Sequence, residues 1–368
     1  MLLPFKSKMT HLVLAAAVLL AGCAAPPTTA SPGGSAAAVS SSATPRVSSS
    51  AEFSGDLPAI GTAANASGDI QQAGGFVHFP GGAFALDPKA AMVQDSDTHL
   101  WRTVTQPYLF GSNGSGRGRI TYDPVVARWI PVARDQVSAD GLHYAYAEPI
   151  LAASSTTQPG GPFITGVHIR LVDLQAESDR VLFSPTGYPF YTVVAYAPQG
   201  IYLTAACVEG CGPQALKLWR LDIATGKLTT VSDRRGFGWL IRGQVAWVAT
   251  YDESNPSSEL LRLDLTTGEV STWLTGPGMQ LIDTDGDGKP LVTLNGGTTS
   301  AQLRVTAPQQ SESLFAGPSN ALQAAVGDGF RTWLAGGPSG AVGIYLYTRA
   351  SGVRKVSDFQ GLPLGPLR

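Results

Sequence analysis

Residues 219–228 read WRLDIATGKL and residues 261–270 read LRLDLTTGEV, so one pattern returns after 42 positions (219 to 261). The same step leads to LRVTA at residues 303–307 and to YLYTR at residues 345–349. Recurrence at a fixed period of about 40 to 50 residues is typical of propellers and solenoids. The chain therefore carries four copies of one structural unit in phase.

Two looser copies lie upstream, RLVDL at residues 170–174 and ITYDP at residues 120–124, and they bring the number of units to six. Between the copies a second feature recurs, a turn-forming sequence that is followed by a short β-rich run. These turns occupy residues 139–141, 198–200, 242–244, 285–288 and 327–329. Each unit therefore holds two hairpins, and hence four strands.

The turns and strands have the residues that β-hairpins need. Asp-Gly sequences tolerate positive φ, and Leu218–Asp222 follows the alternation of a half-buried strand. Six four-stranded units avoid long exposed edges when they close into a ring. We therefore predict an all-β fold, a β-propeller of six blades, or of seven if residues 70–110 add a blade instead of completing the first. We expect Gly75–Phe79 to close the ring by pairing in the last blade.

One turn links the pattern to a known group of proteins. Residues 138–146 read SADGLHYAY, and this resembles the TolB-like and WD40-like six-bladed propellers of bacteria, in which a Ser-x-Asp-Gly turn opens an apolar strand. The resemblance covers roughly residues 75 to 360 and implies the architecture alone. The chain lacks the Gly-His and Trp-Asp dipeptides of true WD40 repeats.

The N-terminus has the pattern of a secretory signal. Lys6 and Lys8 precede an apolar run at residues 12–20, which is shorter than the roughly 20 residues of a membrane-spanning helix. The run ends in LAGC at residues 20–23, which resembles the lipobox of bacterial lipoproteins. The resemblance implies cleavage before Cys23 and a diacylglyceryl group on its sulfur. An ordinary signal peptide with an incidental cysteine is the alternative.

These features divide the chain into three parts. Residues 1–22 are expected to be the lipoprotein signal peptide, and residues 70–368 the β-propeller domain. Between them, residues 23–69 hold the lipidated cysteine and a linker rich in Ala, Ser, Pro and Gly, a composition that buries too little apolar surface to fold. Since two or three acyl chains suffice to hold a protein on a membrane, we expect a lipid-anchored protein on the extracytoplasmic side of the cell membrane.

Composition limits the partners. Charged residues make up 14% of the chain, and the net charge of −2 becomes −4 when Lys6 and Lys8 leave with the signal peptide. A nucleic-acid binder would show a basic excess, so nucleic acid is not an expected partner. Cys207 and Cys211 are separated by three residues, and in an oxidising compartment a disulfide that closes a loop is favoured over free thiols or a metal site.

The sharpest candidate for a metal site is DTDGDG at residues 283–288, in which Asp283, Asp285 and Asp287 have the spacing of a calcium loop. The position that would carry the bidentate Glu of an EF-hand is Leu294. The segment also coincides with an ordinary turn of the repeat. We therefore favour a solvated hairpin turn and keep calcium as the alternative, with no other cofactor expected.

No catalytic set stands out, because the Gly-x-Ser-x-Gly elbow and the phosphate-binding loop are both missing from the sequence. We expect a scaffold that binds an envelope protein or a glycan. The alternative is an extracytoplasmic propeller enzyme of the polysaccharide lyase or hydrolase type, so enzymatic activity stays open, with the balance against it. A pocket shared by Asp95, Asp97, His99, Arg134 and Asp135 would favour the enzyme, and scattered positions would favour binding.

Overall fold

The structure is a computed structural model, and it describes residues 53–64, 70–94, 101–103, 120–152, 164–205, 217–250, 257–295, 300–315, 319–338 and 341–368. All of these residues belong to the larger of two compact units, residues 45–368. Their regular structure consists of β-strands and one short 3-10 helix, η1 (Arg134–Gln136). None of these residues forms a helix of the length and apolarity that a membrane span requires.

Four sheets contain four antiparallel strands each, hydrogen-bonded in chain order. The first two comprise β10 (Tyr191–Ala197), β11 (Gly200–Ala205), β12 (Leu218–Leu221) and β13 (Leu228–Ser232), then β14 (Gly236–Arg242), β15 (Val245–Thr250), β16 (Ser257–Asp264) and β17 (Val270–Pro277). The next two comprise β18 (Gln280–Thr284), β19 (Pro290–Asn295), β20 (Ser300–Ala307) and β21 (Gln310–Ser313), then β22 (Ser319–Asp328), β23 (Arg331–Pro338), β24 (Gly343–Thr348) and β25 (Gly352–Ser357).

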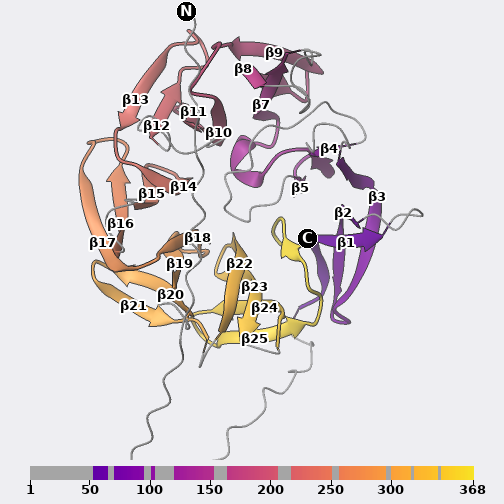
Figure 1. The fold of residues 1–368 in the computed structure, drawn as a ribbon. Helices are drawn as coiled ribbons and strands as arrows, with labels where there is room; N and C mark the ends of the chain where they lie inside the picture. Colours follow the sequence, from indigo (N-terminus) through magenta and orange to yellow (C-terminus); the bar gives the residue numbers. More distant parts are fainter. Residues whose placement is uncertain are drawn as a thin grey trace, which may run out of the picture. The chain divides into compact units, whose positions relative to one another are not determined.

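Two further sheets complete the ring (Figure 1). One holds three strands, β7 (His143–Leu151), β8 (Ile164–Asp173) and β9 (Ser178–Phe183). The other has the order β26-β1-β2-β3-β4 and is built from β26 (Leu362–Pro363), β1 (Gly55–Ala64), β2 (Ile70–Phe79), β3 (Ala83–Gln94) and β4 (Trp101–Thr103). The fold is a six-bladed β-propeller, as the repeat predicts.

The structure explains why the sequence repeat is visible. Asp222 accepts hydrogen bonds on Oδ1 from the backbone N–H groups of Ala224 and Thr225 at 3.1 and 2.8 Å. Gly226 then adopts a φ of 67°, which glycine reaches without steric cost. Asp264 forms the same turn in the next blade. The Asp-x-x-Thr-Gly signature is therefore the hairpin between the third and fourth strands of a blade.

The first repeat unit, at residues 120–124, does not belong to one of the six blades. Residues 121–130 form a separate hairpin of β5 (Thr121–Asp123) and β6 (Arg128–Ile130) outside the six larger sheets. Its rings pack on the first blade, where Phe76 meets Tyr122 at 5.2 Å and Trp129 at 5.4 Å between ring centroids. The sixth blade is instead made by the two ends of the propeller.

Ring closure also differs from the expectation. The stretch Gly75–Phe79 was expected to pair in the last blade, but it lies inside the first sheet, between β1 and β3. The closing strand is β26, which pairs with β1 through Ala59↔Pro363 and Ile60↔Leu362. The C-terminal strand therefore completes the N-terminal sheet.

Strand β1 lies in the stretch that was assigned to the linker, so the folded body begins before residue 70. Leu57 and Ala59 are fully buried and Ile60 is 5% exposed. The strand is rich in Ala and Gly, and this composition hides it among the linker residues in the sequence. It is ordered because it has pairing partners on both edges, β2 and β26.

The core lies between neighbouring blades. One apolar cluster joins β1 and β2 of the first blade to β22, β23 and β24 of the last. Within it the fully buried ring of Trp333 stacks on Phe79 at 5.5 Å between centroids. Burial of large rings contributes about 25 cal/mol per Å² of apolar surface, so this contact stabilises the closed ring.

Candidate functional site

A cavity of about 590 Å³ lies where the inner edges of all six blades converge. Its lining comes from the ends of β10, β14, β18, β22 and β26, and from the η1 segment, which takes the inner position of the three-stranded blade. Val137, at the end of this segment, forms an isolated antiparallel bridge with Tyr144 of β7. The cavity is therefore on the axis of the propeller.

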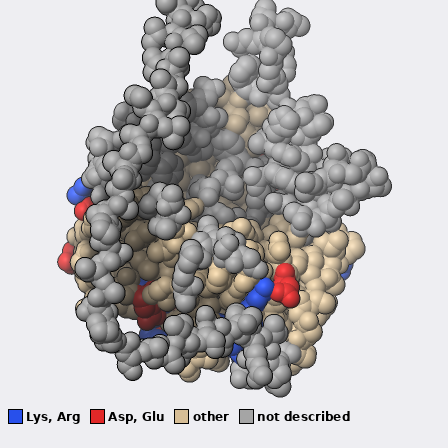
Figure 2. All heavy atoms as spheres, turned by 60° about the horizontal axis from the view of Figure 1, so that its bottom comes forward, with Lys and Arg blue, Asp and Glu red and all other residues tan. Residues whose placement is uncertain are grey.

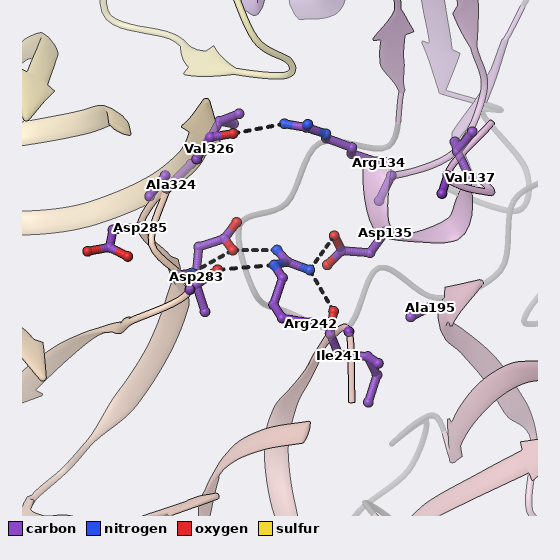
Figure 3. A pocket seen from close by; sticks show the side chains of 18 of the residues that line it. Arg134, Asp135, Val137, Ala195, Ile241, Arg242, Asp283, Asp285, Ala324 and Val326 are labelled. Carbon is purple, nitrogen blue, oxygen red and sulfur yellow. Dashed lines mark hydrogen bonds and ion pairs between the residues drawn. The ribbon is translucent and has the colours of Figure 1, made fainter. Parts of the chain in front are cut away.

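The η1 segment positions two charged side chains in this cavity, Arg134 and Asp135 (Figure 3). Gln136 fixes the segment, because its Oε1 accepts a hydrogen bond from Ala133 N–H and its Nε2 donates one to the carbonyl of Val193, both at 2.9 Å. A helical turn thus replaces strand pairing at this one blade. It directs two consecutive charged residues towards the axis.

Arg242, at the end of β14, organises the polar side of the cavity. Its Nη1 donates to Asp135 Oδ1 at 2.7 Å and to the carbonyl of Ile241 at 2.9 Å. Its Nη2 donates to Asp283 Oδ1 at 2.5 Å, and its Nε to Thr284 Oγ1 at 3.0 Å. Figure 3 shows the guanidinium between the two carboxylates. One side chain therefore connects three blades across the axis.

This network is well shielded from solvent. The side chain of Asp135 is 10% exposed, that of Asp283 11% and that of Arg242 30%. Burial alone would lower the pKa of Arg242, but the charges of Asp135 and Asp283 raise it above its ordinary value. Arg242 stays protonated, and its guanidinium forms ion pairs with both carboxyl groups.

Arg134 has a different environment. Its Nη1 donates to the carbonyl of Gly327, at the end of β22, at 3.2 Å, so the side chain reaches across to the last blade (Figure 3). Among the residues that the structure describes, no carboxylate forms an ion pair with Arg134. Arg134 is thus a positively charged residue of the cavity lining whose hydrogen-bond partner is an uncharged backbone carbonyl.

The three acids of the candidate calcium loop form ion pairs with three arginines. Asp283 binds Arg242. Asp285 forms a buried ion pair with Arg304, and Asp287 lies 3.4 Å from Arg304 Nη2 and 2.7 Å from the Nε of a further arginine, Arg349. Calcium needs six to eight converging oxygens, and the described part of the chain has no group of three His, Cys, Asp or Glu side chains placed to hold a metal.

These residues therefore do not fit a calcium ion. The favoured alternative, a solvated turn, also needs correction, since Asp283 is 8% and Asp285 3% exposed. The turn is an ion-paired element of the cavity wall. The sequence did hold a signal for this, because Arg304 occupies the position of Arg220 and Arg262 in the sister strands.

A second polar group lies beside the cavity. His143 Nε2 is 3.4 Å from Asp173 Oδ2 and its Nδ1 is 3.9 Å from Asp140 Oδ1, while its ring stacks on Tyr196 at 6.4 Å. The Ser138 hydroxyl donates to Asp140 and bonds to the backbone of His143, not to its imidazole. Ser138 therefore stabilises the turn and is not arranged as a nucleophile with His143 as its base.

The predicted site residues are only partly accounted for. Arg134 and Asp135 share the cavity, while the residues Asp95, Asp97, His99, Cys23, Cys207 and Cys211 lie outside the described residues. The two later cysteines fall in the connection between β11 and β12, and their disulfide stays a prediction. Sequence reasoning missed Arg242, which stood out only as part of a turn.

The charged side chains outside the cavity form no large patch of one sign on the face that Figure 2 shows, where those of the described residues lie singly or beside an opposite charge. This agrees with the low charge content of the chain.

Comparison with known proteins finds only distant similarities. No protein-family model and no curated protein matches the chain. Among solved structures it is similar to an oligogalacturonate lyase in complex with manganese, at 12% identity and a TM-score of 0.41, over 79% of this chain and 96% of that one. It is also similar to the oligogalacturonate lyase of Vibrio parahaemolyticus, at 11% identity and a TM-score of 0.43, over 79% of this chain and 90% of that one.

TolB from Acinetobacter baumannii is similar at 16% identity and a TM-score of 0.30, over 59% of this chain and 69% of that one. Identities and scores this low carry no activity from those proteins to this chain.

Proposed function

We propose that this chain is a lipoprotein anchored on the extracytoplasmic side of a membrane, whose propeller binds an envelope protein or glycan at the axial cavity. The observation that carries the binding role is the convergence of all six blades on one cavity that contains Arg134. The anchor rests on the LAGC sequence that ends at Cys23.

The cavity has the properties of a preformed site. Its volume of about 590 Å³ is within the range of roughly 300 to 1,000 Å³ that ligand pockets occupy. The hydrogen bonds of Arg242 to Asp135 and Asp283 come from three blades. A site held in this way loses little conformational entropy when it binds, and this favours affinity.

The test compares two tryptophan substitutions in the full chain. Ala139 is exposed and lines the cavity, so Ala139→Trp should block it without disturbing the core. Ala224 is exposed on a turn that is not part of the cavity lining, so Ala224→Trp is the matched control. Biotinylated chains are used to capture partners from envelope extracts, and bound proteins and glycans are quantified.

We expect the wild type and Ala224→Trp to enrich the same partner and Ala139→Trp to lose it at least tenfold. Equal capture by both variants would show that the partner binds elsewhere. Absence of any enriched protein or glycan with the wild type would contradict the binding role itself.

The enzyme alternative has one specific observation in its favour, the presence of Arg134 and Asp135 in one cavity. A polysaccharide lyase or hydrolase needs charged groups of this kind around the scissile bond. Incubation with acidic and neutral polysaccharides, followed by size analysis, tests it. Shortening that Arg134→Gln abolishes and Arg349→Gln leaves intact would establish the enzyme, and unchanged polymer lengths would exclude that activity on the polymers used.

A further inference from the structure

The charged side chains that line the cavity differ in whether they have a partner of opposite charge. Asp135 and Asp283 share the guanidinium of Arg242, and Asp285, which also lines the cavity, is paired with Arg304. Each of these acids therefore has a cation within the protein. The guanidinium of Arg134 instead donates a hydrogen bond to an uncharged group, the carbonyl of Gly327.

Arginine binds carboxylates well because its planar group donates two parallel hydrogen bonds. Arg134 uses only Nη1 in its hydrogen bond to Gly327, so donors remain for a ligand. The nearby lining is apolar and small, with Val137, Ala195 and Ala324. A ligand can thus place its carboxylate at Arg134 while a small apolar remainder of the same molecule fills the cavity.

The acidic side of the cavity limits the charge of such a ligand. The carboxyl groups of Asp135, Asp283 and Asp285 line that side. A second negative charge on the ligand, placed against these largely buried carboxylates, would meet electrostatic repulsion. Hydrogen-bond donors would be accepted at the same place.

We propose that Arg134 binds the carboxylate of a ligand that carries a single negative charge, either as a free small acid or as the acidic end of a longer chain. The inference rests on the proposed binding role of the cavity and names the chemistry of its ligand. Arg242 is a positioning residue in this scheme, because it holds the wall against which the ligand lies.

The experiment is calorimetric titration of the full chain with matched probes. N-acetylalanine and N-acetylalaninamide differ only in the carboxylate, and D-glucuronate and D-glucose form the corresponding sugar pair. N-acetylasparagine and N-acetylaspartate have the same size and differ by one further charge. The first two pairs distinguish a peptide-like from a sugar-like source of the carboxylate.

In at least one pair we expect the carboxylate to bind at least tenfold more tightly than its neutral partner, a difference of about 1.4 kcal/mol. Arg134→Gln should remove this preference, and Arg134→Lys should restore part of it, because the charge returns without the planar fork. Arg349→Gln, at a side chain that is 67% exposed, is the control and should keep it. N-acetylaspartate should bind more weakly than N-acetylasparagine.

Two results would overturn the inference. One is equal binding of every carboxylate and its neutral partner, or no binding of any probe, while Ala139→Trp still abolishes partner capture. In that case the binding role of the cavity stands and only its ligand chemistry is wrong. The other is a carboxylate preference that persists in Arg134→Gln with an unchanged unfolding temperature.

Discussion

Arg304 on β20 and Asp285 in the turn after β18 form an ion pair in which the two side chains are only 6% and 1% exposed. Burial would lower the pKa of Arg304, but its bond to Asp285 raises the pKa above the ordinary value. Glu312 and Asp287 add further contacts at 3.2 and 3.4 Å. The pair therefore fixes the turn that forms part of the cavity wall.

Arg304→Met is expected to destabilise the propeller by about 3 to 5 kcal/mol, because it leaves the Asp285 carboxylate buried without a counter-charge. Arg262 occupies the same position in the preceding blade but is 29% exposed and lies 3.6 Å from Asp264. Arg262→Met is therefore the matched control and should cost much less. Urea unfolding measures both, and equal losses would contradict the importance of the buried pair.

The Asp turns should make stability depend on pH in acid. The Thr225 hydroxyl and the backbone N–H groups of the turn lower the pKa of Asp222 below its ordinary value of 3.8, and backbone N–H groups do the same for Asp264. The folded state thus holds fewer protons than the unfolded state, so this contribution is complete above the ordinary pKa and is lost as the pH falls through the folded pKa.

The double variant Asp222→Asn with Asp264→Asn keeps the shape of both turns but removes the titration. Its free energy of unfolding between pH 2 and pH 6 should rise less steeply with pH than that of the wild type. Asp233→Asn, at a side chain that is 78% exposed, controls for the removal of an acid. An unchanged pH slope in the double variant would refute this account.

Gly286 permits close contact between two blades. A Cβ at this position would lie 1.8 Å from the carbonyl oxygen of Gly329, and the N–H of Gly286 donates to Thr332 Oγ1 at 3.0 Å. Gly286→Ala should therefore force the turns apart and cost about 1 to 3 kcal/mol, as overpacking does. Gly81→Ala, where the nearest atom is 4.0 Å away, should change the thermal midpoint little.

The proposed membrane anchor would depend on one sulfur atom, that of Cys23. Cys23→Ser should abolish incorporation of labelled fatty acid and move the chain from the membrane fraction to the soluble or precursor pool, because a hydroxyl is not the thiol that the lipobox reaction modifies. Cys207→Ser is the control for loss of a cysteine and should stay in the membrane fraction. Labelling that persists in Cys23→Ser would exclude the predicted anchor.

The repeat could be predicted because its signature is local. Asp222 and Gly226 act within one hairpin, so the same short sequence can recur in another blade, as it does at residues 264–268. Strand β1 could not be recognised, since its small residues resemble a linker and one of its two edges pairs with Leu362 and Pro363 at the other end of the chain. The Ala- and Gly-rich sequence of β1 fits a linker as well as a strand, and only knowledge of its pairing partners distinguishes the two.

The cavity was predictable only in part for the same reason. Arg134 and Asp135 are neighbours in sequence, but Arg242 reaches Asp135 across 107 positions. Spacing of the acids at residues 283–287 suggested calcium, whereas the nearest counter-charges are arginines on other strands. A pattern of acids alone does not reveal which cations the fold brings to them.

Completion of the first sheet by Leu362 and Pro363 has a consequence for the order of assembly. Until the last residues of the chain emerge, β1 has an unsatisfied backbone edge and the arc of blades stays open, a state prone to associate with other chains. The final step of folding must therefore be a contact between residues some three hundred positions apart, and such long-range steps are slow. Nascent chains that stall before residue 362 should be the species that aggregates.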